Sequence, residues 1–174
     1  GVPGTVAGMW YAHEKFGSKP WSELLKYSVN LAQYGFELDP FNLTYLNSSK
    51  YSKYLSIDSE TKKIFTKVDP PFKIGEKFIQ LDLANTLKRI SYYGAREFYE
   101  GQTSQNIIKC MNRTGGIINS IDLKNYKPVE RKPITFEYKD YKIYTMPPPS
   151  SGGVALAQIL KQLENIDLSK ISYH

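Results

Sequence analysis

The sequence has 174 residues, a mass of 19.9 kDa and a net charge of +6 from 23 basic and 17 acidic residues. With 41% hydrophobic residues it can form about one domain that buries roughly 70% of its unfolded surface, which excludes an intrinsically disordered protein. Because it has one cysteine and no apolar run of about 20 residues, we expect neither a disulfide framework nor a membrane-spanning helix.

Three helices are predicted in the first 46 residues. Apolar residues recur at helical spacing, Pro20 and Asp39-Pro40 are typical of helix starts, and glycines are typical of helix ends. The helices are expected from Thr5, as the cap, to Gly17, from Pro20 to Gly35, and from Asp39 through Tyr45.

The next segment is expected to bury little. Residues 47–61 are rich in Ser and Lys, so we predict an exposed connection with at most one helical turn. Ile64-Phe65 and Phe78-Ile79 are predicted to be short extended segments around a turn. Further helices are expected over 82–94, 95–101 and 103–115, the last capped by Thr103 or Ser104, followed by a short capped turn at Ser120.

The periodicity changes after residue 128. Apolar residues alternate on both sides of Lys139-Asp140, which predicts a β-hairpin over about 133–146. A helix follows in which Leu156, Ile159, Leu160 and Leu163 are expected to share a face. The sequence therefore predicts an α+β fold with a helical part, 1–128, and a hairpin plus helix, 129–174, within a single incomplete domain.

Few side chains are candidates for chemistry. His13 lies on an apolar helix face and is expected in the core, the terminal His174 needs no role, and Cys110 is expected to be a buried, inert thiol. Three acidic residues have no partner that their spacing would bring close: Glu97, Glu100 and Glu130. We therefore expect no catalytic nucleophile–base pair, no metal site and no cofactor.

The basic residues do not indicate a nucleic-acid partner. They are scattered along the chain, whereas a nucleic-acid site would gather Lys and Arg on one face with aromatic side chains for stacking. Solvated surface is the favoured interpretation, and no nucleic-acid binding is expected.

The most unusual segment is 147–153, which is expected to be extended and to lead into a helix N-terminus. Such a terminus can hold an anion, or its hydroxyls and glycines can cap the helix and allow close packing, which is the favoured interpretation. Its structural residues are Pro147, Pro148, Pro149, Ser150, Ser151, Gly152 and Gly153.

Five motifs in register resemble those of the γ-glutamyltransferases, also called γ-glutamyltranspeptidases. Their order and spacing agree over nearly the whole chain, least well over residues 47–77. The motifs are Gly1 to Gly8, Phe98 to Gly101, Gly115 to Ile118 with Asp122-Leu123 and Tyr126, Val129 to Ile134, and Pro147 to Gly153.

The resemblance implies part of an N-terminal-nucleophile hydrolase with an αββα sandwich. Such enzymes are precursors that cleave themselves, and the new N-terminal threonine attacks the γ-glutamyl carbonyl of glutathione or similar small molecules, with its own α-amino group as the base. Water, an amino acid or a dipeptide then takes the acyl group. No cofactor is implied.

None of the family's catalytic or substrate-binding residues corresponds to a position in this chain. The resemblance therefore implies a central to C-terminal part of the large subunit, with both ends lying inside a longer polypeptide. Its partners would be the remainder of that precursor, and its location periplasmic, secreted or extracellular-facing. Alone, the chain is expected to be inactive and to expose apolar surface.

Three alternatives stay open. Within the superfamily, the intact protein could act on poly-γ-glutamate or on a β-lactam side chain. Outside catalysis, the chain could be a binding or scaffold module whose segment 147–153 docks a peptide.

Overall fold

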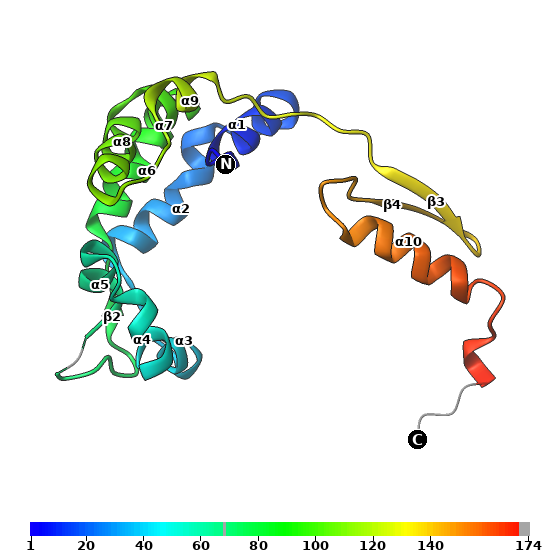
Figure 1. The fold of residues 1–174 in the computed structure, drawn as a ribbon, viewed down its shortest axis with the longest axis horizontal. Coiled ribbons are helices and arrows are strands. Elements are labelled where there is room, and N and C mark those ends of the chain that lie inside the picture. Colours follow the sequence, from blue (N-terminus) through cyan, green and yellow to red (C-terminus); the bar gives the residue numbers. More distant parts are fainter. Residues whose placement is uncertain (68, 171–174) are drawn as a thin grey trace. The chain divides into compact units, whose positions relative to one another are not determined.

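The computed structural model describes residues 1–67 and 69–170 and contains two compact units, Gly1–Pro128 and Val129–His174. The first is mostly helical and the second holds a hairpin and one long helix, so the predicted α+β fold is confirmed (Figure 1). The first unit contains α1 (Thr5–Phe16), α2 (Trp21–Tyr34), β1 (Phe36–Glu37), α3 (Pro40–Leu46), α4 (Ser49–Leu55), α5 (Ser59–Phe65), β2 (Lys77–Phe78), α6 (Leu81–Tyr93), α7 (Ala95–Glu100), α8 (Gln102–Thr114) and α9 (Ser120–Asn125).

Helices α2 and α6 pack against each other in the middle of the first unit. The indole nitrogen of Trp21 donates a hydrogen bond to the carbonyl of Ile90 across 3.1 Å, and fixes the two helices at one end. Near the other end β1 and β2 pair antiparallel, with Phe36 opposite Phe78. This pairing was not predicted, because it joins two-residue strands that are about 40 residues apart in sequence.

A buried apolar core joins α1, α7 and α9. Its buried residues are Ala7, Ala95, Tyr99 and Leu123. The hydroxyl of Tyr99 donates to the carbonyl of Pro3 at 2.7 Å and accepts from the backbone N–H of Ala7 at 3.2 Å. One buried side chain thereby fixes the start of α1 on α7.

Residues 47–61 contain more helix than predicted, because α4 and the first turn of α5 lie there, but none of these residues is buried, as expected. Asp58 starts α5 by accepting a hydrogen bond from the backbone N–H of Thr61, and the ring of Tyr51 on α4 lies 5.3 Å from that of Tyr45. The polar composition of residues 47–61 did not indicate these local contacts, so the prediction missed the helices. Ile64-Phe65 ends α5, so the extended segment predicted there was also wrong.

Several predicted helix ends are shifted. Gly4 precedes α1, so Thr5 is the first helical residue and not the cap, and Gly17 ends the helix with an extended backbone (φ −68°). Gly101 precedes α8. Asn119, and not Ser120, caps α9 through a reciprocal pair of hydrogen bonds with Asp122.

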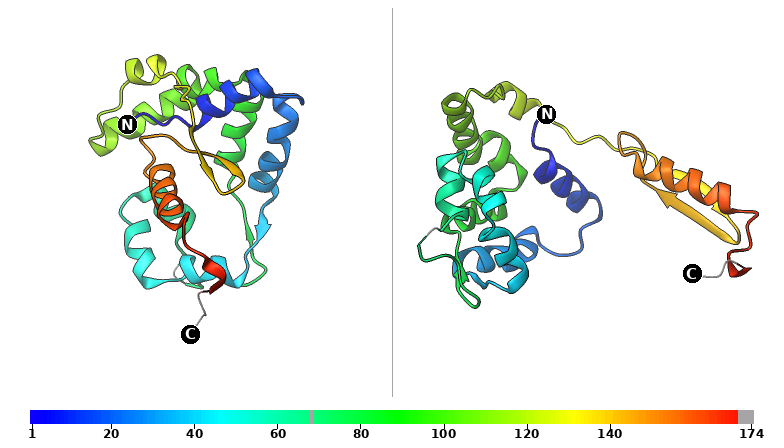
Figure 2. Two further views of the ribbon diagram at one scale, coloured as in Figure 1. Left: turned by 90° about the vertical axis from the view of Figure 1, so that its right-hand side faces the viewer. Right: turned by 60° about the horizontal axis from the view of Figure 1, so that its bottom comes forward.

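The second unit contains β3 (Ile134–Tyr138), β4 (Tyr141–Thr145), α10 (Gly152–Leu163) and a short 3₁₀ helix (Leu168–Lys170). The strands pair antiparallel with Phe136 opposite Ile143, which confirms the hairpin. Helix α10 runs alongside the strands and contacts β3 (Figure 2). Leu160 is half-buried there, but Ile159 remains 54% exposed, so the expected single apolar face is only partly covered.

Candidate functional site

The segment 147–153 leads from β4 into α10, as its sequence predicts, but it forms a turn at 148–149 and not the expected extended segment. The backbone N–H of Ser150 donates to the carbonyl of Pro147 at 3.2 Å, which closes a turn ahead of the helix. Ser151 precedes α10 but its side chain makes no capping hydrogen bond. The predicted hydroxyl cap is therefore wrong at this residue.

Close packing, the second part of that prediction, is present at Gly153. This glycine is buried, and a Cβ atom placed on it would collide with the backbone carbonyl of Met146. Gly152 has no such restriction, since the nearest atom to its Cβ position is the Ser150 hydroxyl oxygen at 3.7 Å. Only the second glycine is required for β4 to approach α10.

A cavity of about 720 Å³ lies beside this segment, within the second unit. Its lining is mainly apolar and includes Val129, Tyr144 and Met146, while Arg131 and Ser150 contribute polar groups. The cavity holds no histidine, cysteine or carboxylate among its lining residues. It can bind a partly apolar group, but no base lies among its lining residues to activate the hydroxyl of Ser150.

The predicted core histidine is half-buried. The Nε2 atom of His13 lies 2.7 Å from the carbonyl oxygen of Lys19, and its ring lies 5.2 Å from the ring of Trp21 and 6.0 Å from that of Trp10. These contacts give His13 a structural role between α1 and α2. His174 lies outside the described residues.

Cys110 is also half-buried, and not fully buried as predicted. Its Sγ atom lies 3.9 Å from a guanidinium nitrogen of Arg113, which forms an ion pair with Asp58 at 3.3 Å. Within residues 1–67 and 69–170, no three His, Cys, Asp or Glu side chains gather in a way that could hold a metal ion.

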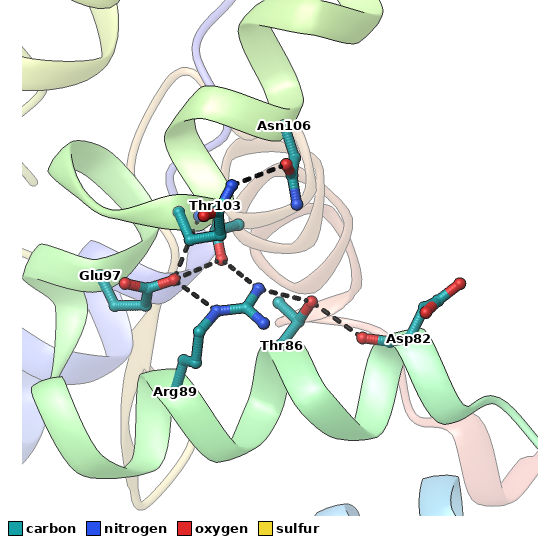
Figure 3. A network of polar contacts seen from close by, with 7 residues as sticks. Asp82, Thr86, Arg89, Glu97, Thr103 and Asn106 are labelled. Atoms are coloured by element: carbon teal, nitrogen blue, oxygen red, sulfur yellow. Dashed lines mark hydrogen bonds and ion pairs between the residues drawn. The ribbon is translucent and has the colours of Figure 1, made fainter.

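A polar network that the sequence analysis missed joins α6, α7 and α8 (Figure 3). Arg89 Nε donates to Glu97 Oε1 at 2.8 Å, and the same oxygen accepts from the backbone N–H and the hydroxyl of Thr103 at 3.1 and 3.0 Å. Arg89 also donates to the hydroxyls of Thr86 and Thr103. The Glu97 side chain is only 7% exposed.

The electrostatics of this network favour an ionised Glu97. Burial opposes ionisation, but the hydrogen bonds from Arg89 and Thr103 outweigh it and hold the pKa of Glu97 below its ordinary value. Because the bound N–H of Thr103 belongs to the first turn of α8, Glu97 caps that helix from the preceding one. The caps predicted at Thr103 or Ser104 were therefore wrong.

The expectation that Glu97 has no close partner was also wrong. Its partner lies eight residues earlier, and the turn at Gly94, whose φ of 69° suits glycine, folds α7 back toward α6. One signal in the sequence could have predicted this contact. Glu97 is an acidic residue on the helix just before α8, and the start of α8 has no side-chain cap of its own. The expectation was wrong for Glu100 as well, because its carboxylate forms an ion pair at 3.7 Å with Arg96, four residues earlier, although this pair lies on the surface.

The chain matches known proteins along its whole length. A family model described as gamma-glutamyltranspeptidase matches residues 1–174. A glutathione hydrolase proenzyme of Pseudomonas sp. (strain A14) is 39% identical and aligns with all of this chain and 30% of its own length. The capsule biosynthesis protein CapD proenzyme of Bacillus anthracis is 42% identical over 98% of this chain and 30% of its own length.

A solved structure agrees with these matches. The crystal structure of Helicobacter pylori gamma-glutamyltranspeptidase superimposes on 99% of this chain and 49% of its own chain, with a TM-score of 0.93 and 41% identity. The likeness confirms the expected fold, part of an N-terminal-nucleophile hydrolase αββα sandwich. The chain spans about 30% of the curated relatives that it matches.

Proposed function

This chain belongs to the γ-glutamyltranspeptidase family, and we propose that the protein of which it is a part cleaves the γ-glutamyl amide bond of glutathione and similar compounds. The observation that carries the proposal is the match over residues 1–174, together with a TM-score of 0.93 to the Helicobacter pylori enzyme. Similarity at this level over all 174 residues supports a shared architecture and a shared class of reaction.

The proposed reaction needs a nucleophile on another segment. A threonine hydroxyl attacks the γ-carbonyl carbon, its proton passes through the threonine's own α-amino group to the leaving amine, and the C–N bond breaks. Water then hydrolyses the resulting ester and releases glutamate, or an amino acid or peptide amine takes the γ-glutamyl group. No residue of the present chain enters these steps.

The role that we assign to this chain is to support that site. Residues 1–128 would form a helical layer of the large subunit, and residues 129–174 would contribute two strands and a helix to the sandwich. The buried link between Arg89 and Glu97 gives the helical layer a fixed geometry. The partner is the remainder of the same precursor, and we place the intact enzyme outside the cytoplasm, in the periplasm or as a secreted protein. None of the helices in the described part of the chain is both long and apolar enough to cross a membrane.

The comparisons leave a second substrate class open. The CapD proenzyme, a capsule biosynthesis protein, is 42% identical to this chain, and the glutathione hydrolase of Pseudomonas is 39% identical. We therefore keep a poly-γ-glutamate chain, the alternative that the family resemblance implies, as the second candidate substrate of the intact protein, and a β-lactam side chain as the remaining acylase alternative. All three candidate substrates are cleaved by attack on an amide carbonyl. Enzymes that act on them therefore differ in the substrate pocket and not in the reaction.

An assay of the full-length precursor tests the proposal. We expect the precursor to release p-nitroaniline from γ-glutamyl-p-nitroanilide and glutamate from glutathione, and the 174-residue chain to release neither. Turnover by the isolated chain would contradict the supporting role. A precursor that is inactive on both small substrates but active on poly-γ-glutamate would establish the poly-γ-glutamate alternative.

A further inference from the structure

The carboxylate of Glu97 uses only one of its two oxygens in the polar network that joins α6, α7 and α8. Oε1 accepts the hydrogen bonds from Arg89 and Thr103, and Oε2 points away from both groups (Figure 3). Within the described part of the chain no group donates a hydrogen bond to Oε2, and no fully buried side-chain oxygen there is without a partner. Oε2 is therefore open to solvent, although the Glu97 side chain is only 7% exposed.

This oxygen lies at a cavity of about 430 Å³, which is lined by Tyr93, Arg96, Glu97, Glu100 and Gly101. A Cβ atom placed on Gly101 would overlap with Glu97 Oε2. The backbone of Gly101 is extended (φ −95°), a conformation that any residue can adopt, so it is the space beside Oε2 that requires glycine here. The glycine thus leaves room for a ligand at a carboxylate oxygen that is otherwise buried.

The charges around this cavity are balanced. Hydrogen bonds hold the pKa of Glu97 below its ordinary value, so this side chain is ionised, and Arg89 neutralises it from the other side. At the rim, Arg96 and Glu100 form a loose ion pair at 3.7 Å, and the Arg96 side chain is 82% exposed. The cavity therefore offers a carboxylate acceptor and a guanidinium donor, and it suits a ligand that carries both an ammonium and a carboxylate group.

We propose that this cavity binds a free α-amino acid with an apolar side chain. The ammonium group donates to Glu97 Oε2, and the carboxylate group accepts from Arg96. The apolar side chain packs on the ring of Tyr93, which is 63% exposed. The proposal goes beyond the proposed function, since no step of that reaction uses these residues.

The geometry of α7 and the size of the cavity fit this ligand. Residues three and four positions apart share one face of a helix, so Glu97 and Glu100, and likewise Arg96 and Glu100, are neighbours on α7. The ammonium and carboxylate groups of an α-amino acid are separated by a single carbon atom, so the ligand can contact both kinds of side chain at once. A volume of about 430 Å³ lies within the range of about 300–1,000 Å³ that is usual for small-molecule sites.

Hydrogen exchange of the full-length precursor, followed by mass spectrometry, tests the proposal at the site itself. The probe is L-phenylalanine, and at ten times its Kd we expect it to slow exchange in peptides that cover residues 93–105 by about 10-fold. Phenethylamine lacks the carboxylate, and 3-phenylpropionate lacks the ammonium group. Each is expected to need at least about a 10-fold higher concentration for the same protection, because each loses one charged contact.

Arg96→Gln tests the carboxylate contact. Because Arg96 is exposed and only loosely paired, the variant is expected to unfold at the same temperature as the unmodified precursor without ligand, but to bind L-phenylalanine about 10- to 100-fold more weakly. Arg96→Lys keeps the charge but not the planar fork, and is expected to bind with intermediate affinity. The matched control is Lys109→Gln, which removes an exposed cation of α8 that does not line the cavity and should leave the protection unchanged.

No protection over residues 93–105 would overturn the proposal, as would equal protection in Arg96→Gln and Lys109→Gln. Phenethylamine that protects as well as L-phenylalanine would show a site for cations, and 3-phenylpropionate that does so would show a site for anions; both outcomes contradict an amino-acid site. Protection confined to other peptides would place the amino acid elsewhere in the precursor and would also reject the proposal. Hydrolysis of γ-glutamyl amides is assayed separately, so the proposed function and this site can fail independently.

Discussion

The Nε atom of Arg89 donates a hydrogen bond to Glu97 Oε1 across 2.8 Å, and this contact joins α6 to α7 where α8 begins. Because the same oxygen accepts two hydrogen bonds from Thr103, one carboxylate neutralises a cation, caps a helix and fixes a turn. A buried charge that makes several contacts is costly to disturb, since removing it leaves the other groups without a partner.

Replacing Glu97 with glutamine is therefore expected to destabilise the helical unit. The amide retains the size of the side chain but removes the negative charge that faces Arg89, and we expect a loss of about 1.5–3 kcal/mol in the free energy of unfolding. Urea denaturation followed by circular dichroism measures it. Glu100→Gln is the matched control, because the Glu100 carboxylate is 3.7 Å from an exposed arginine, and it should change stability by less than about 0.5 kcal/mol. Equal losses in the two variants would contradict a special role for Glu97.

The stability that Glu97 provides is expected to depend on pH. Its pKa is lowered in the folded protein, so the unfolded chain binds more protons in the acid range. The contribution is then fully present above the ordinary glutamate pKa of about 4.3 and is lost as the pH falls through the lower, folded value. The gap in stability between the unmodified chain and Glu97→Gln should accordingly shrink from pH 6 to pH 3. Urea midpoints at intervals of half a pH unit measure it, and a gap that stays constant would exclude this linkage.

The hydroxyl of Tyr99 is expected to stabilise the core that joins α1, α7 and α9. Tyr99→Phe retains the ring that stacks on Tyr126 at 5.7 Å but removes the hydroxyl that bonds to Pro3 and Ala7. Since the N–H of Ala7 then loses its buried partner, we expect a loss of about 1–3 kcal/mol and faster hydrogen exchange at the start of α1. Tyr92 is 81% exposed, so Tyr92→Phe should change neither the stability nor the hydrogen exchange at the start of α1. Unchanged exchange at Ala7 in Tyr99→Phe would show that the hydroxyl does not hold this segment.

Short sequence patterns predicted correctly those elements that depend on interactions between neighbouring residues. The glycine end of α6 at Gly94 and the hairpin around Lys139-Asp140 both follow from a few neighbouring residues, and both are confirmed. The pairing of Phe36 with Phe78 could not be predicted in this way. It depends on the packing of α2 against α6, which no short sequence pattern encodes.

The candidate site also combines features that local sequence predicts with features that depend on tertiary packing. The segment 147–153 was identified from its sequence, but its cavity depends on Val129 and Arg131, which precede β3, meeting Tyr144 on β4. Glu97 was expected to have no close partner, because Arg89 and Thr103 lie on two other helices. Composition indicates which residues are charged, whereas burial and partners are set by tertiary packing.

The two adjacent glycines of segment 147–153 should respond differently to alanine. In Gly153→Ala the new methyl group would overlap the carbonyl of Met146, so α10 or β4 must move, at a cost of about 1–3 kcal/mol. Gly152→Ala places its methyl group 3.7 Å from the Ser150 hydroxyl, an ordinary contact, and it should be neutral or slightly stabilising because alanine favours a helix. Hydrogen exchange of the β3 and β4 amides reports on this unit separately, and we expect it to be about 5- to 150-fold faster in Gly153→Ala and no faster in Gly152→Ala. If the two variants exchange alike, the close approach of Met146 to α10 does not stabilise the hairpin.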